Sequence, residues 1–253
     1  TGASQVEQAV MKAIKSGVAI YSCHTAIDNA TNGVSWEMAR RLNVENIETL
    51  EPQQGKLLKL SVMVPNAHSE AVKTAIFNAG AGTIGNYDCC SFSVQGDGSF
   101  RALSGANPFV GQVGEVHHEP ETRIDVVLPR WLKNRVEIAL INSHPYEEPA
   151  YEFIAIENEL KKIGSGVVGL LPAPMNLSCL VSQIKEAFNS PIVRCNTAED
   201  SQEISKIAMC GGSGAFLISN AIAKGAQVYI TSDVKYHDFV DYKNDIIIVD
   251  IGH

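Results

Sequence analysis

Long apolar runs and an excess of positive charge are both missing from this sequence of 253 residues. No apolar stretch approaches the roughly 18 to 20 uninterrupted residues that a helix needs to cross a bilayer, so we expect a soluble protein. Lys and Arg number 20 against 28 Asp and Glu, which gives a formal net charge of -8. Overall charge therefore does not favour phosphate backbones or anionic lipid, and the composition argues against nucleic acid as a partner.

Signals for export and for disulfide bonding are also missing. The first 17 residues contain no basic start, apolar run or small-residue cleavage site of a secretory signal. The six cysteines include no C-x-x-C pair, and in a chain of this length they are better explained as small apolar side chains in a reducing compartment. We therefore expect a cytoplasmic protein. With 45% hydrophobic and 19% charged residues, the chain should fold around a sizeable core.

Residues 1–55 predict two helices around a short strand. Apolar residues recur at helical spacing over Val6–Ile14, after Ser4 as a capping residue. Val18–Cys23 is a short run of strand formers that ends in a polar string, and a second helix is expected from about Trp36 to Leu42. Polar groups thus follow a strand, where open α/β sheets place their ligands.

Residues 56–158 predict a complete small domain of mixed strands and helices. The expected elements, in chain order, are a strand at 58–64, a helix opened by Ser69, a hairpin whose strands 90–94 and 100–103 flank the Gly96–Gly98 turn, a strand at 124–128, a helix at 131–140 and a strand at 151–156. This order suggests a ferredoxin-like unit.

Residues 159–253 predict alternating strands and helices. A Gly- and Pro-rich stretch at 164–174 precedes a helix led by Asn176, and the strands expected after it are 204–210, 227–231 and 246–251. Such close alternation favours parallel pairing with right-handed crossovers, and the first and last segments are expected to share one sheet. The predicted fold is therefore α/β, with a mixed, largely parallel sheet flanked by helices and interrupted by an inserted ferredoxin-like α+β domain.

His24 and Asp28 follow the first expected strand and form the first candidate site. A neutral imidazole and a carboxylate are ligands that suit zinc, manganese or iron. From the residues alone, the alternative is an Asx-type turn with a histidine bonded to backbone, and this alternative is favoured before other evidence is considered.

Gly211, Gly212, Ser213 and Gly214 lie between an expected strand and a helix at Ala215–Lys224, where bare backbone N–H groups could hold an anion. The loop lacks the Gly-Lys-Ser/Thr of a phosphate-binding P-loop. It resembles a serine nucleophile elbow, but too few residues follow for a hydrolase triad. A tight strand-to-helix turn is the favoured interpretation, and we expect no labelling of the serine by an organophosphonate.

Two further clusters follow strands near the end of the chain. Asp233, Lys235 and His237 combine an acid, a cation and an imidazole, as proton transfer or anion binding would require. A solvated first helical turn is an equally good interpretation of them. The chain then ends in Asp250-Ile251-Gly252-His253, so three strand ends carry His or Asp, and only a shared sheet would make them neighbours.

Two motifs of the middle segment have plainer interpretations. The adjacent His117 and His118 fall in an expected strand, so their side chains point to opposite faces and cannot easily bind one metal ion. The stretch HPYEEPAY at 144–151 could present carboxylates to a partner, but a rigid loop with its tyrosines packed on the core is the preferred interpretation.

Together, four stretches resemble the Nif-three-like dinuclear metal-centre family, whose members are often labelled GTP cyclohydrolase I type 2 homologues. They are CHTAIDNATNGVS at 23–35, CGGSGAFL at 210–217, ITSDVKYHD at 230–238 and DIGH at 250–253. The resemblance covers essentially the whole chain. The middle segment is similar to the P-two and CutA type of ferredoxin-like module that longer members carry as an insertion.

The resemblance implies two divalent metal ions, zinc, manganese or iron, at the sheet edge. It makes Asp28 and His253 metal ligands and His24 a ligand or a close partner of one. The His-His pair and the terminal Glu of the family pattern are absent, so we expect a chain trimmed at both ends that holds metal only partly or not at all.

The resemblance also implies what the protein acts on. The expected function is metal-dependent hydrolysis of a small molecule, a phosphoester or a nucleotide such as GTP, by a ring-like homo-oligomer such as a hexamer. Asp233, Lys235 and His237 would then orient ligands, transfer protons or contact a substrate anion. The alternative is a non-catalytic metal-binding or regulatory protein whose inserted domain senses a ligand or partner.

Overall fold

The computed structural model describes residues 3–253, and the chain divides into two compact units. Unit 1 comprises Thr1–Pro52 and Lys161–His253, and unit 2 comprises Gln53–Leu160. Unit 2 is therefore inserted into the chain of unit 1, and its ends lie close to the boundaries expected from the sequence. No helix within residues 3–253 is long and apolar enough to cross a membrane.

Unit 1 is built on one six-stranded sheet. Its elements are α1 (Gln5–Lys15), α2 (Thr25–Asp28), α3 (Val34–Arg41), β1 (Glu45–Gln53), β6 (Leu160–Met175), α6 (Leu177–Phe188), β7 (Arg194–Cys195), β8 (Ile204–Ser213), the 3₁₀ turn η3 (Ala215–Leu217), α7 (Ile218–Ala223), β9 (Val228–Ser232), α8 (Tyr236–Asp241) and β10 (Ile247–Asp250). The strand order is β1-β6-β8-β9-β10-β7. Strands from both ends of the chain therefore share this sheet, as expected.

The sheet of unit 1 is mixed. β8, β9 and β10 pair in parallel, whereas β6 pairs antiparallel with β8 and β7 antiparallel with β10. The expectation of a largely parallel sheet is therefore wrong outside these three strands, because β6 and β7 enter the sheet in the opposite direction.

Both faces of this sheet are covered. Successive residues of a strand point to opposite faces, so Ile207 and Met209 pack with α3 and α6, while Ala208 and Cys210 pack with α7. The three residues Ile207, Ala208 and Met209 are fully buried, which fixes the register of β8 at the centre of the sheet.

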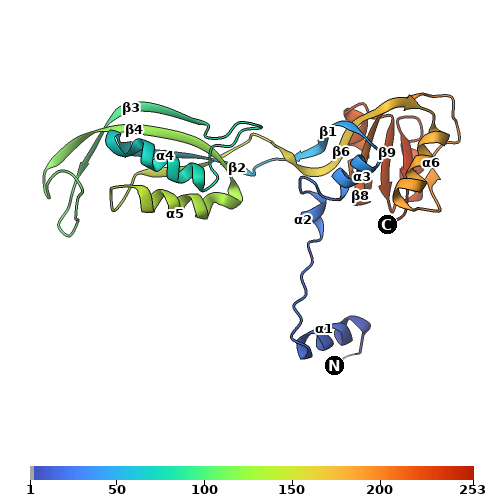
Figure 1. Cartoon of the computed structure of the whole chain (residues 1–253), viewed down its shortest axis with the longest axis horizontal. Helices are drawn as coiled ribbons and strands as arrows, with labels where there is room; N and C mark the ends of the chain where they lie inside the picture. Colours follow the sequence, from blue (N-terminus) through green and yellow to red (C-terminus); the bar gives the residue numbers. More distant parts are fainter. Residues whose placement is uncertain (1–2) are drawn as a thin grey trace. The chain divides into compact units, whose positions relative to one another are not determined.

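Unit 2 has a sheet of its own. Its elements are β2 (Leu57–Pro65), the 3₁₀ turn η1 (Asn66–His68), α4 (Ser69–Asn78), β3 (Ser91–Arg101), β4 (Val116–Pro129), the 3₁₀ turn η2 (Arg130–Leu132), α5 (Lys133–Ser143) and β5 (Tyr151–Ile156). The strand order is β3-β4-β2-β5, with every pairing antiparallel. Figure 1 shows α4 and α5 on one side of this sheet, where Val62, Ile76, Ile124 and Leu140 form a fully buried core.

The expected hairpin at Gly96–Gly98 is wrong. β3 runs straight through these residues, and Gly98 lies opposite Glu119 in an unbroken antiparallel register with β4. A Cβ atom on Gly98 would lie 2.2 Å from the Glu121 carboxylate. The glycine at position 98 therefore leaves room for a side chain of the neighbouring strand.

One other expectation about unit 1 fails. Val18–Cys23 is not a strand, because no other segment pairs with it among the residues that the structure describes. The Gly- and Pro-rich stretch 164–174 forms part of β6, which changes register between Leu170 and Met175. Gly164 and Gly166 adopt positive φ angles of 158° and 64° in β6, so glycine serves a bent strand there.

Candidate metal centre at the ends of β8, β9 and β10

The carboxyl ends of three parallel strands bring the candidate residues of the last segment together. β8 ends at Ser213, β9 is followed by Asp233, and β10 by Gly252 and His253. Because parallel strands end at the same edge of a sheet, residues separated by 20 to 40 positions in the chain meet there.

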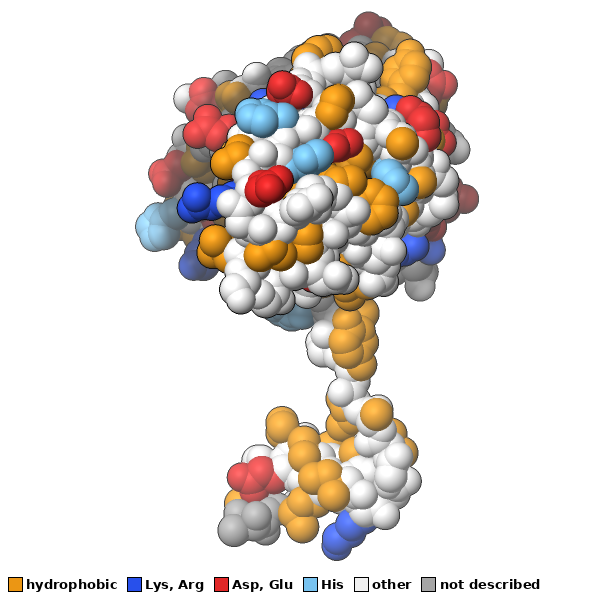
Figure 2. Space-filling model, turned by 90° about the vertical axis from the view of Figure 1, so that its left-hand side faces the viewer, with side chains coloured by type: hydrophobic (Ala, Val, Ile, Leu, Met, Phe, Trp, Pro, Cys, Tyr) orange, Lys and Arg blue, Asp and Glu red, His pale blue; other side chains and the backbone are white. Residues whose placement is uncertain are grey.

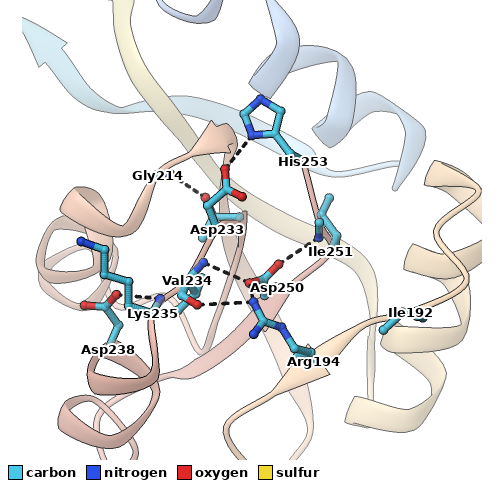
Figure 3. Close-up of polar contacts among 12 residues, drawn as sticks. Ile192, Arg194, Gly214, Asp233, Val234, Lys235, Asp238, Asp250, Ile251 and His253 are labelled. Atoms are coloured by element: carbon cyan, nitrogen blue, oxygen red, sulfur yellow. Dashed lines mark hydrogen bonds and ion pairs between the residues drawn. The ribbon is translucent and has the colours of Figure 1, made fainter.

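His253 and Asp233 form the central contact of this edge. The Nδ1 atom of His253 lies 2.6 Å from the Oδ2 atom of Asp233, and Figure 3 shows the two side chains pointing toward one another. Their side chains are 74% and 50% exposed. An imidazole held at Nδ1 by a carboxylate leaves Nε2 as the ligand atom, an arrangement that is common for metal-binding histidines.

Asp250 holds the two loops that carry this pair, although it was not among the expected site residues. Its carboxylate is 2% exposed and accepts N–H bonds from Val234 at 3.0 Å and from Gly252 at 2.9 Å. It also forms an ion pair with Arg194, whose guanidinium donates to the Val234 carbonyl oxygen as well (Figure 3). One buried carboxylate therefore fixes the residues adjacent to both Asp233 and His253. The sequence signal for it is a single acid within an apolar strand.

Asp28 and His253 each lie near a residue in the last part of β8, and no hydrogen bond or ion pair joins the two among residues 3–253. The α2 region is tied to β6 by Asn29, whose carbonyl oxygen accepts from the Gly164 N–H at 3.0 Å. Asp28 ends α2, and its charge acts on Cys210 near the end of β8. The His253 ring lies beside Gly212, with Cε1 3.8 Å from the position of a Cβ there.

The remaining expected residues are less closely engaged. His24 is exposed and caps α2 with a positive φ of 38°, while Lys235 and His237 are exposed at the start of α8. The Lys235 N–H donates to the Asp238 carboxylate at 3.1 Å, as a helix start requires.

No group of three His, Cys, Asp or Glu side chains within residues 3–253 is arranged to hold a metal ion. The ligand roles of His24, Asp28 and His253 stay predictions.

The glycine loop at the end of β8 has structural partners. The Gly211 N–H donates to Ser35 at 3.1 Å and the Gly214 N–H to Thr231 at 3.0 Å. The buried Tyr229 hydroxyl donates to the Gly214 carbonyl oxygen at 2.8 Å. Two of the four amides expected to hold an anion are therefore bonded to side-chain oxygens. The expected helix at 215–224 is the turn η3 followed by the short α7.

Cys210 should be the least reactive cysteine near this edge. Burial raises the pKa of its thiol, and the Asp28 carboxylate adds to the rise, while the Ser35 hydroxyl opposes it. A raised pKa means less thiolate at a given pH, and thiolate is the reactive form. At pH 8 we expect iodoacetamide to modify the exposed Cys23, Cys89 and Cys179 at least tenfold faster than Cys210, as measured by peptide mass spectrometry. Equal rates in the folded protein would contradict the buried position of Cys210.

Known proteins resemble this chain over nearly its whole length. A family model described as Duf34/NIF3 (NGG1p interacting factor 3) matches residues 1–253. A Halalkalibacterium halodurans protein named GTP cyclohydrolase 1 type 2 homolog is 41% identical over 246 residues, which cover 96% of this chain and 66% of that protein. A Bacillus subtilis protein of the same name is 39% identical with the same coverage. This chain thus spans 66% of the length of these curated relatives.

Solved structures agree with the sequence comparison. A Bacillus cereus protein related to NIF3 superposes with a TM-score of 0.86 at 35% identity, covering 99% of this chain and 67% of that one. The Staphylococcus aureus protein SA1388 superposes with a TM-score of 0.68 at 27% identity, covering 99% of this chain and 66% of that one. Since the family model matches every residue and the relatives share the fold, the chain belongs to the Duf34/NIF3 (NGG1p interacting factor 3) family.

Proposed function

We propose that this protein is a divalent-metal-binding protein with hydrolase-like activity, and that the residues described above supply part of its metal site. The observation that carries the proposal is the His253–Asp233 contact, 2.6 Å long and held by the buried Asp250. The names of the relatives, GTP cyclohydrolase 1 type 2 homolog, support a nucleotide or phosphoester as the substrate class.

The residues present fit one side of a metal site. Imidazole nitrogen and carboxylate oxygen suit zinc, manganese and iron, and the Asp233 carboxylate fixes the His253 ring as the carboxylate partner of a metal-bound histidine does. His253 and Asp28 would bind metal, with His24 as a third ligand or a partner of one. Two such ions would supply Lewis-acid activation of a water molecule.

The chain's own residues have separate roles in this proposal. Asp233 holds the proton on Nδ1 of His253 and so keeps Nε2 free to bind. Lys235 and His237, exposed at the start of α8, would attract a substrate anion or transfer a proton. The glycine loop at 211–214 is a weaker anion-site candidate, because two of its amides are already bonded.

We also propose a ferredoxin-like fold for unit 2 and a ring-like homo-oligomer for the natural protein. The βαββαβ order of unit 2 and its antiparallel strand order β3-β4-β2-β5 support the first. The second follows from the family resemblance, and sedimentation of the natural protein tests it.

Metal content tests the site. In a protein of the relatives' full length we expect about two divalent ions per chain by plasma mass spectrometry. Asp28→Ala and His253→Ala should each lower this content by about half or more, because each removes a ligand. Asp241→Ala, an exposed acid on α8, is the matched control and should retain the metal. Unchanged metal in both ligand variants would refute the assignment.

Turnover separates an enzyme from a regulatory protein. Manganese- or zinc-dependent hydrolysis of GTP or of a phosphoester that both ligand variants lose would support the hydrolase. Metal binding without turnover would support the alternative, a regulatory protein. The cavity in unit 2, which contains none of the proposed metal ligands, is the observation that favours this alternative.

A further inference from the structure

Unit 2 contains a cavity of about 420 Å³, in the size range of small-molecule sites. It lies between the end of β3, the loop after it and the loop before β5. Its lining is mostly apolar, with Phe100, Ala102, Leu103, Pro108, Phe109 and Ala150 among the residues that form it. Figure 2 looks at one end of unit 2, where hydrophobic side chains lie beside carboxylates and histidines.

Three aromatic rings frame this cavity. The Tyr146 ring centroid lies 5.8 Å from that of Phe100 and 6.3 Å from that of Phe109. His144 fixes Tyr146, since its Nε2 donates to the Met63 carbonyl oxygen at 2.9 Å and its Nδ1 accepts from the Tyr146 N–H at 3.1 Å. This pairing requires a neutral ring, in accord with the lowering of the His144 pKa by burial. The HPYEEP stretch thus forms a rigid wall, and Tyr146 lines the cavity.

The polar end of the cavity is negative and incompletely bonded. The Tyr146 hydroxyl is shielded from solvent and interacts with the Glu121 carboxylate, and its oxygen accepts no hydrogen bond from any group within residues 3–253. Glu121 lines the cavity, and within residues 3–253 it forms no ion pair with a Lys or Arg side chain. Burial raises the pKa of Glu121, and burial with the nearby Glu121 charge raises the pKa of Tyr146. Glu147 and Glu148 add two carboxylates, against the single guanidinium of Arg101.

We infer that this cavity binds a small organic cation, an amine or a quaternary ammonium group carried on an apolar body about the size of one ring. Aromatic faces attract cations through their quadrupole, most strongly where water is excluded. Glu121 would provide the countercharge, and the Tyr146 hydroxyl oxygen would accept from an ammonium N–H. The apolar walls formed by Leu103, Pro108 and Phe109 would cover the body of the ligand.

Matched probes test this inference on the 253-residue chain by calorimetry. We expect 2-phenylethylamine and benzyltrimethylammonium to bind at least tenfold more tightly than neutral 2-phenylethanol, and 3-phenylpropionate not to bind. Glu121→Gln should weaken both cations at least tenfold and leave 2-phenylethanol unchanged. Glu152→Gln, the same change at an exposed position on β5, should leave all affinities unchanged. Ala106→Trp, which fills the cavity from its exposed edge, should abolish binding without lowering the melting temperature.

Three results would overturn the inference. One is equal affinity for the cationic and neutral probes, and another is full cation binding by Glu121→Gln. The third is absence of binding in a chain that self-associates and becomes monomeric on Phe109→Ser, because the apolar wall would then be an interface between copies of the chain. None of these readouts depends on a bound metal, so they are independent of the metal-centre proposal.

Discussion

Asp250→Ala is expected to lower the free energy of unfolding by about 3 kcal/mol, since breaking a buried charge pair and leaving buried amides unpaired costs that much. The Asp250 carboxylate is 2% exposed. It forms an ion pair with the Arg194 guanidinium and accepts hydrogen bonds from the backbone N–H groups of Val234 and Gly252. Arg194 is itself 58% exposed and can be resolvated, which limits the loss. Urea unfolding followed by circular dichroism measures the change.

The same variant should also disturb the candidate site. Without Asp250 the loops that carry Asp233 and His253 lose their common anchor, so the His253 ring resonances should shift in an NMR spectrum recorded under native conditions. Asp245→Ala is the matched control, because Asp245 is exposed in the loop before β10, and it should change stability by less than about 0.5 kcal/mol. Equal effects of the two substitutions would show that Asp250 does not anchor this edge.

Gly214→Ala is expected to destabilise the protein more than any other Gly→Ala substitution near this edge. We expect the free energy of unfolding to fall by about 3 kcal/mol or more, which is the upper end of the usual cost of overpacking a core. An added Cβ would lie 2.6 Å from the Cys210 Cβ and from the Thr231 Oγ1, and 2.8 Å from the Tyr229 hydroxyl. All three neighbours are buried in the centre of unit 1, so none can move aside cheaply. Thermal and urea unfolding both measure the loss.

Gly96→Ala provides the comparison for this prediction. Gly96 lies in β3 of unit 2 with nothing within 4 Å of an added Cβ, so the substitution should be close to neutral or slightly stabilising. If Gly214→Ala were equally well tolerated, the packing around β8 would be looser than the structure shows. A loss confined to Gly214→Ala supports a packing role for that glycine in the CGGSG stretch.

The sequence predicted the elements whose local signals agree with their surroundings. Helix α6 begins after Asn176, whose side chain accepts from the Cys179 N–H at 3.0 Å, and β5 spans the predicted Tyr151–Ile156. Two local signals misled. Val18–Cys23 has a strand-like composition but no partner strand within residues 3–253, and Gly96–Gly98 resembles a turn but lies in an unbroken β3. The amino-acid composition of a segment indicates whether it tends to be buried and how freely its backbone moves. Strand pairing depends in addition on which other segments lie beside it in the fold.

In the candidate site, too, some features could be predicted from the local sequence and others could not. The sequence singled out Asp233 and His253, and the structure places them in contact at 2.6 Å. Nothing in the local sequence pointed to Arg194, which contacts Asp250 across 56 positions of the chain. Long-range ion pairs of this kind leave no periodic or motif signal, so they could not be predicted from the residues alone.

By itself the sequence determined the family, the helix caps at Ser4 and Asn176, the strand at 151–156 and the residue types available for metal or anion chemistry, because these depend on local patterns. Only the tertiary structure decided that β8, β9 and β10 end at one edge, that Asp250 anchors it, and that Tyr146 lines a cavity in unit 2. The physical reason is that packing and charge pairing between distant segments depend on three-dimensional distance, which the order of residues does not encode locally.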